Sequence, residues 1–454
     1  MAVLAGMELL VFAFALGLSL LPHFDGESPL EPRTWVEILT RALLFAPVLS
    51  ISMVATGLYN ERQTFNRVGL FTRIAVSTVG GTLVIAIVAA LVPEVSFGRD
   101  ALTLAGVLVI AGSLGCHFIV SKLAGEQVFK KRILVYGAGR RAASLMQRQA
   151  AGILGGYKAV GFVPTVCDEP SAVSTERRVE LRSNLLEYCQ AHEVFEIVVA
   201  MDDSSADFPF EALLECRLAG IAVSDLTEFL ERETGQVRID LVHPNRMVFS
   251  DGFERNSLHS QIERGVDVVG SLALLAVSWP FMLLAIAAIK IEEGWSAPVL
   301  YRQVRVGEHG QPFRLFKFRS MRVDAERDGR ARWAAANDDR VTRVGRVIRK
   351  LRIDELPQII NVLNGEMSLV GPRPERPEFV SQLNTKIPLY RERHAIKPGI
   401  TGWAQLCYPY GSNEKDAAEK LQYDLFYVKN RNLLFYLAIL VQTVEVILWG
   451  KGAR

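Results

Sequence analysis

Long apolar stretches recur along the first 122 residues of the chain, with few charges inside them. Each stretch approaches the roughly 20 residues that a helix needs to cross a bilayer. The first lacks the basic start and the clear small-residue cleavage site of a signal peptide, so we interpret it as a membrane helix that is not cleaved from the protein. The pattern predicts a block of four transmembrane helices within residues 1–125, and the simplest role of such a block is to anchor the chain. The four stretches are 3–22, 36–59, 74–93 and 101–121.

Charges between these stretches predict their orientation. Residues 61–73 contain three arginines and residues 122–132 contain four basic residues, whereas residues 23–35 are acidic and residues 94–100 are nearly neutral. Basic loops stay on the cytoplasmic side of a membrane. We therefore expect both segments that flank the block to lie in the cytoplasm.

Between residues 126 and 250 the pattern changes to short apolar runs that alternate with helical stretches. Strands that alternate with helices predict a parallel α/β sheet of the Rossmann-like kind. The strand-like runs are 131–136, 158–163, 196–201 and 221–226, and two of the helical stretches are 182–192 and 209–219.

A G-x-G-x-x-A turn follows the first of these strands, with glycines at Gly137 and Gly139. Such glycines let a pyrophosphate approach the N-terminus of the next helix. No acidic residue closes a strand about twenty residues later, because the second strand ends in Val163-Pro164. We therefore expect a structural or regulatory domain in preference to one that binds NAD or another nucleotide. A nucleotide-sugar dehydratase is excluded, because the chain contains no Tyr-x-x-x-Lys pair.

A fifth apolar stretch, at about 264–290, is also long enough to span a bilayer. A fifth crossing would place the rest of the chain outside the cytoplasm, and both flanks, Arg264 and Lys290, are basic. Pro280 removes one backbone hydrogen bond and kinks the helix, and Ser278 could satisfy a freed carbonyl. We predict a re-entrant helix that enters and leaves on the cytoplasmic face, with a fifth spanning helix as the alternative.

Two adjacent carboxylates, Asp354 and Glu355, precede Pro357 and a short apolar helix that Asn364-Gly365 ends. Proline is tolerated only in the first turn of a helix or outside it, so we expect Asp354 at or next to the N-cap, where the helix dipole favours the ionised carboxylate. A carboxylate pair among guanidiniums suits a magnesium-dependent phosphoryl transferase. The alternative is a capped surface helix with solvated ion pairs. The nearby arginines are Arg346, Arg349, Arg352, Arg373 and Arg376.

Residues 352–374, RIDELPQIINVLNGEMSLVGPRP, resemble the signature of the polyprenyl-phosphate hexose-1-phosphate transferases, which start bacterial exopolysaccharide and O-antigen synthesis. The resemblance extends from about Arg255 to the C-terminus. The large form of this family places four membrane helices and a Rossmann-like domain ahead of the catalytic part, and residues 231–253 resemble its exosortase-associated branch. Further blocks of the family follow its order: PVLYRQVRVG (298–307), FRLFKFRSM (313–321), KPGITGWAQ (397–405) and YDLFYVKN (423–430).

This resemblance implies transfer of hexose-1-phosphate from a UDP-sugar, with UDP-glucose and UDP-galactose as first candidates, to undecaprenyl phosphate, with release of UMP. It implies Asp354 and Glu355 as the catalytic pair, with Asp354 as a nucleophile that forms a covalent sugar-phosphate. It also implies that both carboxylates hold Mg²⁺. The candidates for binding substrate phosphate are Lys317, Arg319, Arg352, Arg373, Arg376 and Lys397.

Two positions depart from the family pattern. Relatives break the membrane helix at adjacent Ser-Pro, whereas here Trp279 precedes Pro280 and the serine is Ser278. Many relatives carry arginine where this chain has Lys397, and lysine lacks the bidentate fork of a guanidinium.

Charge and cysteine content exclude some other classes of function. The net charge of +2 argues against a nucleic-acid binder, and the five cysteines form no metal-spaced cluster or disulfide framework. Two alternatives stay open: a membrane-bound nucleotide-sugar oxidoreductase and a non-catalytic scaffold of a polysaccharide assembly complex.

We expect an integral membrane protein of α plus α/β class in the bacterial inner membrane, possessing three parts. A four-helix membrane block covers 1–125, a Rossmann-like domain 126–250, and a mostly helical catalytic domain 251–454. Its expected partners are the lipid bilayer, undecaprenyl phosphate, a UDP-sugar and a second copy of the chain.

Overall fold

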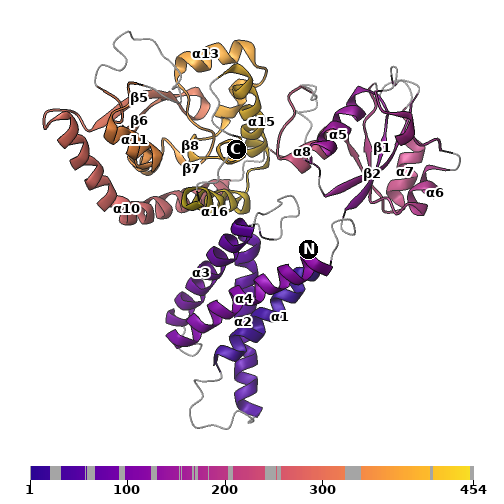
Figure 1. The fold of residues 1–454 in the computed structure, drawn as a ribbon, viewed down its shortest axis with the longest axis horizontal. Coiled ribbons are helices and arrows are strands. Elements are labelled where there is room, and N and C mark those ends of the chain that lie inside the picture. The colour runs from indigo at the N-terminus through magenta and orange to yellow at the C-terminus, as the bar shows by residue number, and fades with distance from the viewer. Residues whose placement is uncertain are drawn as a thin grey trace. The chain divides into compact units, whose positions relative to one another are not determined.

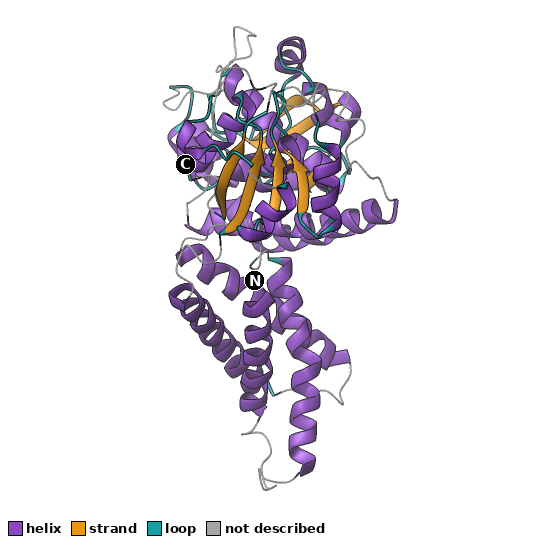
Figure 2. Ribbon diagram, turned by 90° about the vertical axis from the view of Figure 1, so that its right-hand side faces the viewer, coloured by secondary structure: helices purple, strands orange, loops and turns teal. Residues whose placement is uncertain are grey.

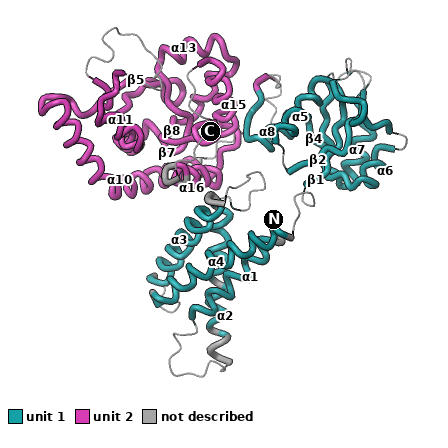
Figure 3. The backbone as a smooth tube through the Cα atoms, viewed as in Figure 1, with its two compact units in different colours: residues 1–238 teal, residues 239–454 magenta. Residues whose placement is uncertain are grey.

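The computed structural model divides into two compact units, residues 1–238 and 239–454 (Figure 3). The predicted boundaries at 125/126 and 250/251 lie outside the described residues. The structure describes residues 2–20, 32–56, 58, 67–91, 98–123, 130–152, 154, 156–165, 168, 172–181, 184–202, 208–240, 252, 257–322, 339–408 and 413–449.

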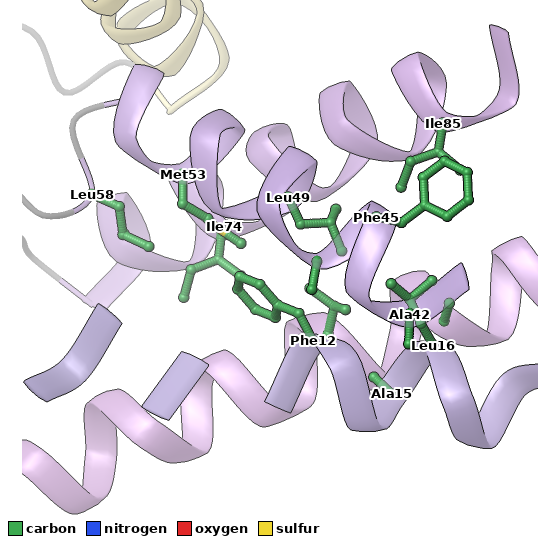
Figure 4. Packing of buried hydrophobic residues seen from close by; sticks show 13 residues of the cluster. Phe12, Ala15, Leu16, Ala42, Phe45, Leu49, Met53, Leu58, Ile74 and Ile85 are labelled. Atoms are coloured by element: carbon green, nitrogen blue, oxygen red, sulfur yellow. The ribbon is translucent and has the colours of Figure 1, made fainter. Parts of the chain in front are cut away.

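Helices form at all four apolar stretches of the N-terminal part: α1 (Ala2–Leu20), α2 (Pro32–Ala55), α3 (Arg67–Leu91) and α4 (Arg99–Leu123). Helix α1 packs against α2 and α4, and α3 packs against the same two helices. Their shared core is a cluster of buried apolar side chains, in which Phe12, Phe45, Leu49 and Ile74 lie between the helices (Figure 4).

Three helices are long and apolar enough to cross a membrane among the described residues. Two of them belong to the predicted block, over Leu70–Ala90 of α3 and Asp100–Val120 of α4. The apolar parts of α1 and α2, Leu4–Leu20 and Ile38–Val54, are shorter. Three described helices therefore have the length and composition of membrane spans, and a block of four spans stays a prediction.

The predicted parallel sheet is confirmed. Its four strands, β1 (Lys131–Tyr136), β2 (Tyr157–Val163), β3 (Glu196–Val199) and β4 (Ala222–Asp225), lie in the order β2-β1-β3-β4. Figure 2 draws the strands of the structure in orange. The third strand ends two residues earlier than the pattern predicted. Figure 1 shows α5 on one side of the sheet and α6 and α7 on the other. The helices of this part are α5 (Arg140–Ala150), α6 (Leu185–Ala191), α7 (Phe210–Leu218) and α8 (Leu226–Thr234).

The second unit is mostly helical, with two small sheets. Strands β5 (Leu300–Val306) and β6 (Pro312–Phe318) form an antiparallel hairpin, and β7 (Ser368–Val370) pairs in parallel with β8 (Gly399–Thr401). The helices are α10 (Ser257–Glu293), α11 (Arg343–Lys350), α12 (Gln358–Leu363), α13 (Pro377–Lys386), α14 (Trp403–Cys407), α15 (Glu414–Asn430) and α16 (Leu433–Trp449), with 3₁₀ turns η5 (Ile353–Glu355) and η6 (Tyr390–Ala395).

Helix α10 is the third membrane-length helix and contains Pro280. Figure 1 shows α10 bent part-way along its length, as a proline in a helix interior causes. Side chains such as Val277, Trp279 and Phe281 are exposed apolar groups beside the proline. The expectation that Ser278 satisfies a freed carbonyl is wrong, because its hydroxyl lies 3.9 Å from the sulfur of Met282. The re-entrant course of α10 stays a prediction.

Candidate active site

The two carboxylates lie in η5, a short turn between α11 and α12. Arg352, just before the turn, adopts a left-handed conformation with φ of 59°, which ends the run of α11 and redirects the chain. Pro357 is the N-cap of α12, and Asn364 with Gly365 at φ +83° ends that helix as predicted. The prediction of Asp354 at or next to this N-cap is therefore wrong, because the intervening 3₁₀ turn separates it from α12.

Glu355 is held by three cations. Its Oε1 lies 2.7 Å from Arg373 Nη2 and 3.3 Å from Lys317 Nζ, and its Oε2 lies 3.9 Å from Arg352 Nη1. Burial opposes ionisation of this carboxyl, but the charges of Arg373, Lys317 and Arg352 outweigh burial and hold its pKa well below the usual range. Glu355 is therefore a permanent anion that gathers three cations at one point.

Asp354 differs from its neighbour. Its side chain is buried, and among the described residues it has no hydrogen-bond or ion-pair partner. Burial and the charge of Glu355 raise its pKa, although Lys317, Arg349 and Arg373 act in the opposite direction. The expectation that a helix dipole favours its ionised form is corrected here, because burial and the adjacent anion dominate. A buried carboxyl group with a perturbed pKa beside several cations is a candidate functional group.

The loop that carries Arg373 is fixed at both its backbone and its side chain. Arg373 Nη1 donates to Gln405 Oε1 at 3.1 Å, and Arg393 Nη2 donates to the Arg373 carbonyl at 3.1 Å. Gly371 allows close contact with the next block, because a Cβ there would lie 2.3 Å from the carbonyl oxygen of Lys397. The GPRP loop and the KPGITGWAQ block thus form one rigid support for the guanidinium.

Lys317 is positioned by the β5–β6 hairpin, which α12 ties in place. The Asn361 side chain accepts from the Phe316 amide at 3.1 Å and donates to the Arg314 carbonyl at 2.7 Å. Asn361, Gln405 and Arg393 are functional neighbours that the sequence pattern alone did not predict. The first two lie inside the blocks that carry the family resemblance, so those blocks contained the available signal.

The other three predicted phosphate-binding residues are Arg319, Lys397 and Arg376. Arg319 has a buried Nη1 with no hydrogen-bond partner among the described residues. The Lys397 ammonium lies beside Gly365 at the end of α12, 3.8 Å from where a Cβ on that glycine would sit. Arg376 is the N-cap residue of α13. The structure thus brings Lys317, Arg352 and Arg373 to the carboxylate pair.

A magnesium site would have few protein ligands here. The described residues contain no group of three or more His, Cys, Asp or Glu side chains suited to a metal. Mg²⁺ is usually held by one or two carboxylates together with water and substrate phosphates. The unpaired oxygens of Asp354 fit that pattern, whereas Glu355 Oε1 already contacts Arg373 and Lys317.

The glycine-rich turn of the middle domain is filled by side chains of the chain itself. Asp202 accepts from the amides of Arg140 and Arg141 at 2.8 and 2.9 Å, at the N-terminus of α5. A Cβ on Gly139 would lie 2.2 Å from the same carboxylate, and Asp168 accepts from the Ala138 amide at 2.8 Å. Asp202 thereby takes the position that a pyrophosphate uses in dinucleotide-binding turns.

Replacing Asp202 by alanine should destabilise the middle domain by about 1–2 kcal/mol, because two amides lose their acceptor. Thermal unfolding of the purified protein measures the loss. Asp202→Asn keeps one acceptor and serves as the matched control. Unchanged stability in Asp202→Ala would contradict the capping role.

Comparisons with known proteins extend these observations. Residues 258–450 match the family described as "Bacterial sugar transferase". The chain is 42% identical over 262 residues to a UDP-N-acetylgalactosamine-undecaprenyl-phosphate N-acetylgalactosaminephosphotransferase of Aeromonas hydrophila, covering 57% of this chain and 60% of that protein. It is 29% identical over 437 residues to a UDP-glucose:undecaprenyl-phosphate glucose-1-phosphate transferase of Xanthomonas campestris pv. campestris, covering 92% and 89%.

A third relative decides family membership. The uncharacterized sugar transferase EpsL of Bacillus subtilis (strain 168) is 41% identical over 197 residues, which cover 42% of this chain and 90% of EpsL. The matched region contains Asp354, Glu355, Lys317 and Arg373. The chain belongs to the bacterial sugar transferase family and is a phosphoglycosyl transferase of its large, polyprenyl-phosphate-dependent form.

Proposed function

We propose that the protein transfers a sugar-1-phosphate from a UDP-sugar to undecaprenyl phosphate and releases UMP, as the first step of exopolysaccharide or O-antigen synthesis. The observation that carries this proposal is the contrast between the two carboxylates. Among the described residues, Asp354 is buried and has no hydrogen-bond or ion-pair partner, whereas Glu355 beside it holds Lys317, Arg352 and Arg373. The names of the Aeromonas and Xanthomonas relatives describe the same class of reaction.

In the first step, an Asp354 oxygen attacks the phosphorus that bears the sugar. A bond forms between that oxygen and phosphorus, the bond to the bridging oxygen breaks, and UMP leaves with the electron pair. The product is an acyl phosphate between the enzyme and the sugar. Arg373 and Lys317 lie on the Glu355 side of the nucleophile, where they can stabilise charge on the phosphoryl oxygens.

In the second step, an oxygen of the lipid phosphate attacks the same phosphorus. The bond from phosphorus to Asp354 breaks, the carboxylate is restored, and a lipid diphosphosugar leaves. Each step is a displacement at one phosphorus, so the same cations serve both. Glu355 keeps these cations in place, because its low pKa leaves it ionised throughout.

We propose Asp354 and Glu355 as the protein ligands of Mg²⁺, with Glu355 acting through Oε2 because its Oε1 already contacts Arg373 and Lys317. The bound ion would neutralise diphosphate charge and ease departure of UMP. Because the described residues offer this carboxylate pair and no group of three or more candidate ligands, substrate oxygens and water would complete the coordination.

The sugar is proposed from the relatives and the sequence together. UDP-glucose and UDP-galactose are the candidates from the sequence, and the printed name of the Xanthomonas relative contains glucose. The Aeromonas relative is the more similar of these two in sequence, and its name contains N-acetylgalactosamine. UDP-N-acetylgalactosamine is therefore a third candidate donor substrate.

We also propose that the catalytic part lies on the cytoplasmic face of the bacterial inner membrane, with α10 as a re-entrant helix, and that the protein is a homodimer. Basic loops beside α3 and α4 support this orientation. UDP-sugars are cytoplasmic substrates, so the site must face them.

The middle domain is proposed to be structural or regulatory, because Asp202 fills its glycine-rich turn.

The test is UMP release by detergent-solubilised, full-length protein supplied with Mg²⁺, undecaprenyl phosphate and each UDP-sugar in turn. One or two sugars should give lipid-dependent UMP. If a folded protein releases UMP from none of them, the transferase proposal fails and the scaffold alternative takes its place. Reduction of NAD by a UDP-sugar would instead support the oxidoreductase alternative.

The pH dependence should report Asp354. Attack needs the ionised carboxylate, and the raised pKa means that protonation begins at a higher pH than the usual value of about 3.9 for aspartate. Activity should therefore fall on the acid side, with a midpoint above that value. Arg349→Gln removes a positive charge that lowers this pKa, so its midpoint should move to higher pH. Identical acid limbs in the two proteins would contradict this assignment.

A further inference from the structure

Helix α10 contacts the segments that carry the proposed reacting groups, and the first of these contacts is made by Asp267 of α10. The Asp267 Oδ1 atom accepts from Ser368 Oγ at 2.9 Å, from the Leu369 amide at 2.7 Å and from Tyr436 Oη at 2.6 Å. Asp267 is only 4% exposed, so these donors replace water around its charge. Ser368 and Leu369 belong to β7, which runs directly into the loop that carries Arg373.

The helix also approaches β7 closely through its backbone. A Cβ on Gly270 would lie 2.8 Å from the Leu369 Cδ1 atom, so a larger residue there would force the Leu369 side chain to move. One turn before Asp267 along the helix, Arg264 donates to the carbonyls of Val362 and Leu363 at 2.5 and 2.7 Å. These are the last carbonyls of α12, which need a partner outside their own helix. The first part of α10 therefore holds both β7 and α12.

The C-terminal end of α10 contacts α11, the helix that precedes the turn with Asp354. Glu292 accepts from the amides of Arg343 and Val344 at 2.8 and 3.0 Å, at the start of α11. A carboxylate at this place satisfies free amides and complements the helix dipole. In addition, Ala285 and Ile289 of α10 share a buried cluster with Ile348 and Ile353. Ile353 directly precedes Asp354.

We propose that Asp267 and Glu292 are positioning residues, through which α10 fixes the position of the Asp354 turn relative to the Arg373 loop. This inference rests on the proposed function, since it concerns the geometry of that transfer. Neither residue touches Asp354 itself: Asp267 acts through β7 and Glu292 through α11. Helix α10 is also long and apolar enough to cross a membrane. In this proposal, the helix that would enter the membrane also sets the distance between the nucleophile Asp354 and the cation Arg373.

Asp267→Asn tests the first contact while preserving side-chain shape. The amide lacks the charge that faces three donors, so β7 should loosen and Arg373 should shift. Misplacement on the order of 1 Å costs about 100-fold in rate, and we expect kcat to fall about 10- to 100-fold. KM for the UDP-sugar should change less than about 3-fold, because the effect falls on alignment.

Ser368→Ala is the second variant, and it keeps the Asp267 carboxylate while removing one donor. Its kcat should fall less than that of Asp267→Asn, and it remains informative if the asparagine variant does not fold. Glu292→Gln should lower kcat by a smaller factor, and Glu292→Asp should restore part of the loss. The matched control is Glu263→Gln, which removes a carboxylate of the same helix that pairs with His259 and Arg431, outside the Asp354 and Arg373 segments.

Each full-length variant is reconstituted in nanodiscs and measured for kcat, KM, unfolding temperature and hydrogen exchange. Asp267→Asn should show faster exchange in residues 368–376, while α1–α4 and the parallel sheet keep their protection. Wild-type kcat in Asp267→Asn and Ser368→Ala, or an equal loss in Glu263→Gln, would overturn the proposal. So would loss of protection throughout the chain, since that pattern indicates general unfolding. If the wild type releases no UMP, the proposed function fails, and the exchange pattern alone decides the positioning role.

Discussion

Asp354→Asn should lower turnover by at least about 1,000-fold, because the amide cannot attack phosphorus and no covalent intermediate forms. The same variant should unfold at an equal or higher temperature than the wild type. A raised pKa in the folded state means that protonated Asp354 contributes stability below the unfolded pKa of about 3.9. This contribution is lost as the pH rises through the folded pKa. Asparagine carries no charge and avoids that loss.

UMP release and thermal unfolding at neutral pH measure the two effects together. Asp354→Glu is the matched control, because it keeps the carboxylate and moves it by one methylene. Retained turnover in Asp354→Asn would remove the nucleophile assignment. A large fall in its unfolding temperature would show instead that the ionised carboxylate stabilises the fold.

Glu355→Gln should lower kcat by about 100-fold and destabilise the catalytic unit by about 2–3 kcal/mol. The variant leaves Lys317 and Arg373 near each other without their shared anion, so both side chains should turn toward solvent. Steady-state kinetics and thermal unfolding test this expectation. Asp354→Asn and Glu355→Gln therefore have opposite effects on stability, although they change neighbouring carboxylates in the same way.

Glu355→Asp distinguishes the effect of the negative charge from the effect of side-chain length. It keeps the anion but shortens the side chain, so stability should recover more than activity does. Equal stability of the wild type and Glu355→Gln would contradict the claim that Glu355 gathers the cations.

Much of the architecture followed from pattern. Apolar length predicted the helices at 3–22, 36–59, 74–93 and 101–121, because helix formation in apolar surroundings depends on length and composition. Alternation of apolar runs and helical stretches predicted a parallel sheet, because a parallel pair needs a crossover between its strands. Asn364-Gly365 predicted the end of α12, because Gly365 adopts a positive φ that other residues avoid.

Other features depended on contacts that sequence distance hides. Arg352 adopts a left-handed conformation, which few arginines do, and the 3₁₀ turn that follows moved Asp354 away from the N-cap. The two carboxylates are adjacent in sequence, yet only the fold supplies Glu355 with Arg373 and Lys317. Asp267 meets Ser368 across 101 residues, and Asp202 meets Arg140 across 62. No local pattern predicts such pairs.

The most direct test of the central claim is a search for the covalent intermediate without lipid. Full-length protein is mixed with Mg²⁺ and its UDP-sugar, and UMP and intact-protein mass are recorded over a single turnover. We expect one UMP per active protein and one added sugar-phosphate, located by peptide mapping on Asp354 and lost on treatment with hydroxylamine. Asp354→Asn should give neither. UMP release that strictly requires undecaprenyl phosphate, or an adduct on another residue, would contradict nucleophilic attack by Asp354.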